Sequence, residues 1–188
     1  MTRTLASMLF FASALSITGP ATALAEGFKL MSQDIAPAQF MTKKQEFNGF
    51  GCDGKNLSPQ LSWKNPPKGT VSLAITAYDP DAPTGSGWWH WQLVNIPKDV
   101  TFLNSGAGAP NANLSPKGSR ILKNDYGQMG FGGACPPEGH GVHRYQFTIH
   151  ALSQKLEIPE GASSALVGYL INANTIASST LEALYKRD

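Results

Sequence analysis

The chain has 188 residues, of which only 15% are charged and 41% are hydrophobic. So few charges exclude a coiled coil or a solvated helical array, and so many apolar residues exclude a disordered chain. The net charge of +2 gives no indication of a nucleic acid or an anionic membrane as partner. With 19 glycines and 13 prolines, the composition predicts a turn-rich, mainly β fold.

The first 25 residues have the order of a cleaved secretory signal peptide. Arg3 precedes the uncharged stretch Leu5–Ile17, and Ala23-Leu24-Ala25 forms a small-x-small cleavage site. A helix over that stretch would span roughly 20 Å, which is short of the ~30 Å hydrocarbon core and argues against an uncleaved anchor. We therefore expect export to the periplasm or the medium, and one domain over residues 26–188 with no transmembrane segment.

Two segments of the mature chain, Val71 to Tyr78 and Arg144 to Ala151, have the period-two alternation of half-buried strands. Trp89 to Ile96 is a third predicted strand. It is followed by Pro97, which cannot donate a hydrogen bond to a strand ladder. These three segments predict the main sheet of the protein.

The ends of the mature chain carry less regular patterns. Phe28 to Met31 and the stretch around Phe40 are weaker strand candidates. After Pro159, an Ala-, Leu- and Ser-rich run from Ala162 to Tyr185 predicts one or two short helices. The order is therefore strands first and helices last.

The two cysteines, Cys52 and Cys135, have neither CxxC nor zinc-ligand spacing. An oxidising compartment favours their pairing, whereas two buried unpaired thiols are the alternative. We predict a disulfide bond between them. The chain-entropy estimate for a loop of this length is about 4–5 kcal/mol of stabilisation.

Three further segments concentrate the side chains that can do chemistry. They are Asp79-Pro80-Asp81-Ala82-Pro83, Trp88-Trp89-His90-Trp91, and the run from Cys135 to Tyr145 that enters a strand at His143. No GxSxG, HExxH, P-loop or GxGxxG motif is present. The simpler interpretations are a rigid turn for the first segment and core or pocket wall for the tryptophans.

His140, His150 and Arg144 are not expected to contact a ligand. By strand alternation, Arg144 and His150 lie on the face of their strand that points away from the core. We expect His140 and His150 to be structural or exposed. We expect Arg144 to form a local salt bridge rather than to contact a ligand.

In their combination and order, these motifs resemble the phosphatidylethanolamine-binding protein family, and specifically its bacterial Raf-kinase-inhibitor-like branch. The resemblance rests on FGCDGKNLSPQLSW at 50–63, ITAYDPDAP at 75–83, WHWQLVNIP at 89–97, NDYGQMGFGG at 124–133 and HRYQFTIHAL at 143–152. It covers almost the whole mature chain. Ala134 stands where the branch usually has a proline, and the C-terminal segment matches poorly.

The resemblance implies a β-sandwich of two packed sheets with short C-terminal helices and a small cavity for phosphate and other small anions. The residues that it carries over to the cavity are Asp79, Asp81, His90, Pro136, Pro137, His143, Tyr145 and Tyr185. Two imidazole N–H groups, a phenol and loop backbone would then donate to the anion.

The carboxylates of this set would orient the imidazoles and favour imidazolium, so that anion affinity falls as the pH rises through roughly 6.5. Alternatively, one aspartate would meet the ammonium of an ethanolamine headgroup, with Trp88 or Trp89 offering a ring face to it.

Three functions from different classes are consistent with these residues. The first is an exported, non-enzymatic protein that binds phosphate-bearing small molecules or phospholipid headgroups, without a cofactor, and that modulates a partner protein. The second is a metal- or histidine-dependent hydrolase or isomerase, with His143 as general base. The third is a structural or host-interaction protein with a vestigial pocket. The identity of a protein partner and the formation of a homodimer are left open. An exported protein would not meet the kinases of its own cytosol, so kinase inhibition is not expected.

Overall fold

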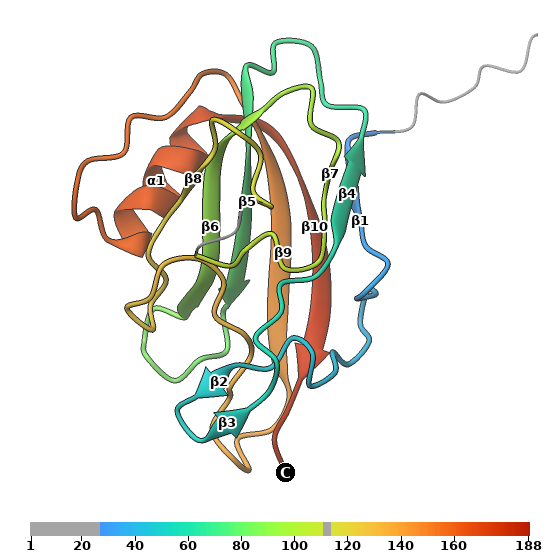
Figure 1. The fold of residues 1–188 in the computed structure, drawn as a ribbon, viewed down its shortest axis with the longest axis vertical. Coiled ribbons are helices and arrows are strands. Elements are labelled where there is room, and N and C mark those ends of the chain that lie inside the picture. The colour runs from blue at the N-terminus through green and yellow to red at the C-terminus, as the bar shows by residue number, and fades with distance from the viewer. Residues whose placement is uncertain (1–26, 111–113) are drawn as a thin grey trace, which may run out of the picture.

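The computed structural model describes residues 27–110 and 114–188, so the predicted signal peptide lies outside the described residues. At the centre is a five-stranded antiparallel sheet with the strand order β10-β9-β5-β6-β8 (Figure 1). Its strands are β5 (Ser72–Asp79), β6 (Trp88–Pro97), β8 (Arg120–Ile121), β9 (His143–Leu152) and β10 (Thr175–Tyr185). The three strands predicted from the sequence are thus the three inner strands of this sheet.

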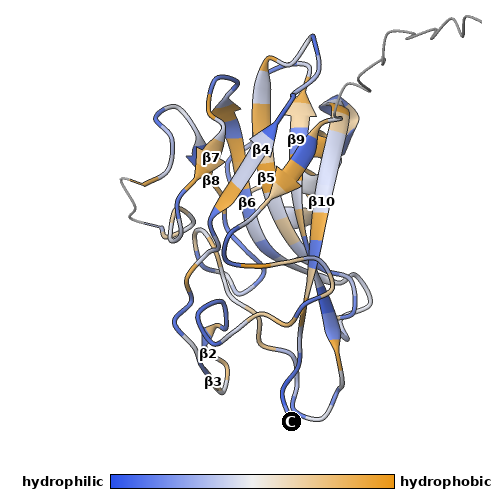
Figure 2. Ribbon diagram, turned by 90° about the vertical axis from the view of Figure 1, so that its right-hand side faces the viewer, coloured by the Kyte–Doolittle hydropathy of each residue, from blue (hydrophilic) through white to orange (hydrophobic). Residues whose placement is uncertain are grey.

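A smaller antiparallel sheet, in the order β1-β4-β7, packs on one face of the central sheet. Its strands are β1 (Lys29–Met31), β4 (Leu61–Lys64) and β7 (Phe102–Leu103), and a separate hairpin pairs β2 (Asn48–Gly49) with β3 (Cys52–Asp53). Figure 2 shows β4 lying across the long strands, with hydrophobic residues recurring along them. The predicted β-sandwich of two packed sheets is confirmed.

The main hydrophobic core fills the space between the two sheets. Because side chains alternate along a strand, every second residue of an inner strand points into this core. From the central sheet it contains Leu73, Ile75, Trp91, Leu93, Phe147 and Ile149, and from the smaller sheet Leu30, Leu61, Trp63 and Leu103. This packing explains why these segments alternate in the sequence.

A second hydrophobic cluster covers the opposite face of the central sheet. Helix α1 (Ser164–Asn174) packs there through Val167 and Ile171. The Ser163 side chain caps this helix by accepting a hydrogen bond of 3.2 Å from the backbone N–H of Leu166. The helix approaches the sheet closely at Gly168, where a Cβ atom would lie 2.8 Å from the Trp89 ring. The inner strands are consequently buried on both faces.

The expectation of helices up to Tyr185 is only partly correct. One helix is present, and the chain from Thr175 to Tyr185 forms the edge strand β10 instead. It pairs with β9 over almost its whole length, and Leu181, Ala183 and Tyr185 alternate as buried residues. Pairing with a long neighbouring strand and this period-two burial override the helical preference of alanine and leucine.

His150 is structural rather than exposed, which is one of the two interpretations given above. Helix α1 covers that face, and His150 is only 8% exposed. Its ring nitrogens lie 3.2 Å from the Thr76 hydroxyl and 3.3 Å from the Thr175 hydroxyl. Burial lowers the pKa of His150 to about 4, so the imidazole is neutral at pH 7.

This burial predicts a loss of stability in acid. An unfolded histidine has a pKa of about 6.5, so the contribution of His150 is fully present above that pH and is lost as the pH falls toward 4. We expect the free energy of unfolding from urea denaturation to fall by up to about 3 kcal/mol from this residue between those pH values. His150→Gln should show a smaller fall over the same range, and an equal fall in the variant would contradict the assignment.

Candidate functional site

A cavity of about 340 Å³ lies at the end of the central sheet where β5 ends and where β6 and β9 begin. These ends meet because the three strands are antiparallel, with Asp79 of β5 opposite Trp88 of β6. Figure 1 shows the β2–β3 hairpin and the C-terminus gathered at this end of the molecule. The cavity is lined by Phe50, Asp79, Ala82, Pro83, Thr84, Trp88, His90, Tyr126, Cys135, Pro136, Pro137, His143, Tyr145 and Arg187.

A β-bulge in β6 brings His90 to the cavity. Ala77 of β5 pairs with Trp91, whereas the next residue, Tyr78, pairs with Trp89, so His90 is one extra residue in its strand. The His90 ring contacts the ring of Tyr145 at a centroid distance of 5.1 Å, and its neighbour Trp91 belongs to the main core. Two consecutive side chains therefore point to the same side of the sheet, which regular alternation would not allow.

The hydrogen bonds of His90 determine which nitrogen faces a ligand. Its Nδ1 lies 2.8 Å from the carbonyl oxygen of Gly132 and 3.1 Å from that of Gly133, and the residue is 3% exposed. Carbonyl oxygens only accept, so Nδ1 carries the hydrogen. Burial lowers the pKa of His90, which leaves a neutral ring whose Nε2 is an acceptor. Among the described residues, this Nε2 has no hydrogen-bond partner.

His143 belongs to a chain of three polar groups. Its Nδ1 donates to Oδ2 of Asp79 over 2.7 Å, and both residues are buried. Its Nε2 lies 2.7 Å from Nδ1 of His140, which is exposed, so the two rings share one hydrogen. The chain runs from a buried carboxylate to the surface. The expectation of free imidazole N–H donors is thus wrong for His90, and at His143 both nitrogens are already engaged.

Tyr145 presents a phenol to the same cavity. It is 2% exposed, and its hydroxyl has no hydrogen-bond partner within the part of the chain that the structure describes. Burial, together with the nearby charge of Asp79, raises the pKa of Tyr145, so the hydroxyl keeps its hydrogen at neutral pH. A phenol can donate to an anion or accept from a ligand.

Two of the expected site residues lie outside the cavity. The Asp81 carboxylate accepts hydrogen bonds from Arg144 at 2.9 Å to Nε and 2.7 Å to Nη2, and the guanidinium lowers the pKa of Asp81 to about 2. The local salt bridge expected for Arg144 is confirmed. Tyr185, from β10, instead donates to the buried carboxylate of Glu46, away from the lining residues.

The tryptophans divide among three environments. Trp88 lines the cavity, Trp91 lies in the main core, and Trp89 packs against Tyr78 and Gly168 on the helix side of the sheet. Of the two ring faces considered for an ammonium group, only that of Trp88 is available at the site. This division follows from the bulge at His90.

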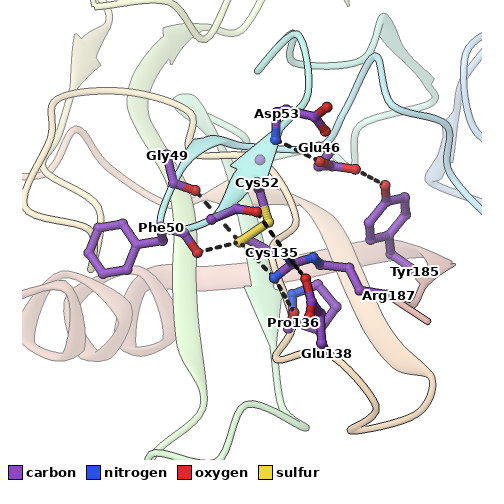
Figure 3. The surroundings of a disulfide bond; sticks show 12 residues. Glu46, Gly49, Phe50, Cys52, Asp53, Cys135, Pro136, Glu138, Tyr185 and Arg187 are labelled. Atoms are coloured by element: carbon purple, nitrogen blue, oxygen red, sulfur yellow. Dashed lines mark hydrogen bonds and ion pairs between the residues drawn. A yellow bond between two sulfur atoms is a disulfide. The ribbon is translucent and has the colours of Figure 1, made fainter.

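The rim of the cavity is closed by the predicted disulfide between Cys52 and Cys135 (Figure 3). Arg187 spans the same two segments, because its guanidinium donates to the carbonyl oxygens of Gly51 at 2.8 Å and Pro136 at 3.3 Å. It also forms an ion pair of 2.6 Å with Glu138. The hairpin and the Pro136-Pro137 loop are therefore held together by the disulfide bond and by the guanidinium of Arg187.

The lining residues that the sequence analysis missed include Phe50, Thr84, Tyr126 and Arg187. Phe50 and Tyr126 lie inside segments that resemble the family, and Tyr126 stacks on Phe47 at a centroid distance of 4.0 Å. Phe50 has a backbone φ of 54° and is 73% exposed at the mouth of the cavity. No sequence signal pointed to Arg187, because the resemblance is poorest at the C-terminus.

Removal of the disulfide tests its contribution to stability. We expect the double variant Cys52→Ala/Cys135→Ala to unfold with a free energy lower by about 4 kcal/mol, because the unfolded chain gains the entropy of an open loop. Urea denaturation of the variant and of the oxidised and reduced protein measures this difference. The reduced protein should resemble the variant, and equal stability of all three forms would contradict the prediction.

Known proteins are similar to this chain over most of its length. Residues 32–186 match the family model described as phosphatidylethanolamine-binding protein. The chain belongs to the phosphatidylethanolamine-binding protein family. All five segments that resemble the family lie within this matched range, because they run from residue 50 to residue 152.

Relatives of the family include two proteins of Escherichia coli K12. The UPF0098 protein YbcL is 48% identical over 166 residues, which cover 88% of this chain and 91% of YbcL. The UPF0098 protein YbhB is 44% identical over 158 residues, which cover 84% of this chain and 99% of YbhB. The crystal structure of E. coli YbcL, described as a new member of the mammalian PEBP family, matches with a TM-score of 0.84 at 47% identity, over 87% of this chain and 100% of that one.

A further relative comes from Mycobacterium tuberculosis. LppC of Mycobacterium tuberculosis, which is named as a lipoprotein, is 37% identical over 114 residues, or 61% of this chain and 52% of LppC. Over residues 27–110 and 114–188, no helix has the length and apolar character needed to cross a membrane. Nothing in these comparisons favours the hydrolase or isomerase hypothesis.

Proposed function

We propose that this protein is an exported, non-enzymatic binding protein that holds a phosphate-bearing small molecule or a phospholipid headgroup in the cavity at the end of the central sheet. One observation carries the proposal: three buried polar atoms that make no hydrogen bond within the described residues belong to residues that line the same cavity. They are Nε1 of Trp88, Nε2 of His90 and the hydroxyl of Tyr145. A buried polar group without a partner costs roughly 1–3 kcal/mol, which a bound ligand would recover.

The rest of the lining suits a small polar ligand. A volume of about 340 Å³ is at the lower end of the usual range for small-molecule sites. The walls are mainly aromatic rings and prolines, which exclude water and strengthen the few polar contacts. Arg187 contributes a cation at the rim, and the pair His140–His143 shares a hydrogen beside the cavity.

Export is supported by separate observations. Residues 1–25 have the order of a signal peptide, and the disulfide between Cys52 and Cys135 suits an oxidising compartment. A relative named as a lipoprotein agrees with a location outside the cytosol. We place the protein in the periplasm or the medium, where a partner protein of that compartment would be the one that it modulates.

A calorimetric titration of the purified protein with phosphoethanolamine at pH 6 tests this function. We expect saturable binding that is weakened about 10- to 100-fold in Tyr145→Phe, because a hydrogen bond from the phenol to a charged oxygen is lost. Thermal stability should be unchanged or higher in this variant, since the hydroxyl has no partner among the described residues.

Tyr169→Phe is the matched control, because Tyr169 lies on α1 and is 68% exposed. It should bind phosphoethanolamine as the unmodified protein does. No saturable binding in the unmodified protein, or equal binding in Tyr145→Phe, would refute the cavity as the ligand site.

A further inference from the structure

A second hollow lies beside β8, the edge strand of the central sheet on the side away from β10 (Figure 1). Its volume is about 260 Å³, and it lies between the segment that begins with β8 and the loop that precedes α1. It shares no lining residue with the cavity at the end of the sheet. The two hollows are therefore separate spaces in the molecule.

The inner wall of this hollow is apolar. Leu122 and Ile158 are buried members of the hydrophobic cluster beneath α1, and Ala162 packs against the same cluster. Met129 belongs to the outer wall, with 46% of its surface exposed. Its unbranched thioether side chain adapts to the shape of a neighbouring group. An alkyl chain placed in this hollow would consequently leave water and contact apolar side chains.

The same hollow is lined by two cations, Arg120 and Lys123. Neither forms an ion pair within residues 27–110 and 114–188, whereas the other two described arginines are each paired with a carboxylate. Glu157 and Glu160 belong to the nearby loop but do not line the hollow. The described lining thus has two positive charges and no negative one.

The guanidinium of Arg120 is fixed from one side only. Its Nη1 donates to the backbone carbonyl oxygen of Ile158 over 2.7 Å, which joins β8 to the loop before α1. Its Nε and Nη2 donate no hydrogen bond within the described part of the chain. These two nitrogens carry parallel N–H groups that match the two oxygens of a carboxylate. One edge of the guanidinium is therefore held in place and available to an anion.

We propose that this hollow is a second ligand site, which binds a carboxylic acid with a short alkyl chain, such as a medium-chain fatty acid. The carboxylate accepts hydrogen bonds from Nε and Nη2 of Arg120 and is attracted by the ammonium of Lys123. The alkyl chain covers the side chains of Leu122 and Ile158. This inference goes beyond the proposed function, because the site lies apart from the cavity and its ligand needs no phosphate.

Both parts of this ligand contribute to its recognition. Arg120 and Lys123 are exposed, so an ion pair with a small carboxylate alone is weak in water and is screened by salt. An alkyl chain without a charge gains by leaving water but leaves the guanidinium edge unused. Affinity therefore requires the charge and the chain in one molecule.

Calorimetric titration of the purified protein with octanoate, acetate and 1-octanol at pH 7.5 tests this site. We expect saturable binding of octanoate that is at least about 10-fold tighter than that of acetate or 1-octanol. Hexanoate should bind about 10-fold more weakly than octanoate, because each CH₂ group removed from the contact lowers the affinity about 3- to 4-fold.

Arg120→Gln should weaken octanoate binding about 5- to 10-fold, because a charged hydrogen-bond pair is lost at a partly exposed site. Lys68→Gln is the matched control, since it also removes one positive charge. Lys68 is exposed in the turn before β5 and does not line the hollow, so this variant should bind octanoate as the unmodified protein does.

Further titrations separate this site from the cavity. Octanoate should bind to Tyr145→Phe as it binds to the unmodified protein, and phosphoethanolamine should bind equally to Arg120→Gln and to the unmodified protein. Displacement of octanoate by phosphoethanolamine, or weaker octanoate binding in Tyr145→Phe, would place octanoate in the cavity and overturn this inference alone. Octanoate binding without phosphoethanolamine binding would overturn the proposed function alone.

Three other results would contradict the second site. They are no saturable binding of octanoate, affinity for acetate or 1-octanol equal to that for octanoate, and equal octanoate affinity in Arg120→Gln and the unmodified protein. If Arg120→Gln does not fold, the comparison of the probes on the unmodified protein and on Tyr145→Phe decides the question.

Discussion

The hydrogen bond between the buried carboxylate of Asp79 and the buried imidazole of His143 is the contact on which the site depends. A buried carboxylate without partners would cost several kcal/mol, so the ends of β5 and β9 must stay together to keep it paired. With the backbone N–H of Asp81, this bond gives each carboxylate oxygen one hydrogen bond from the protein. It thereby holds the carboxylate and the imidazole in place among the residues that line the cavity.

Regular strand pairing near that contact is interrupted at His90. Both faces of the central sheet are covered, one by the smaller sheet and the other by α1, which makes the inner strands rigid. The bulge at His90 breaks the alternation of β6 and adds one side chain to the cavity side without removing Trp91 from the core. The disulfide and Arg187 then hold the rim segments, whose own backbone has little regular structure.

Much of the fold could be predicted because its signals are local. In Ser72–Asp79 and His143–Leu152, one face of each strand contacts the main core and the other face contacts different groups, so the alternation is visible in neighbouring residues. The strand β10 was missed because its alanines, serines and leucines have no strong β preference and are ordered by pairing with β9. The sequence left open whether His150 is structural or exposed, because the helix that covers it follows later in the chain and its position is not encoded near the histidine.

By itself, the sequence determined the class of fold, the pair of cysteines and the segments that meet at the site, since periodicity and the order of motifs depend on neighbouring residues. Only the tertiary structure decided that Asp81 and Tyr185 lie outside the cavity, that Arg187 reaches its rim, and which nitrogen of His90 is left for a ligand. The reason is physical. The partner that orients His90 is a carbonyl 42 positions away, and the direction of a hydrogen bond is set by atoms that the fold brings together.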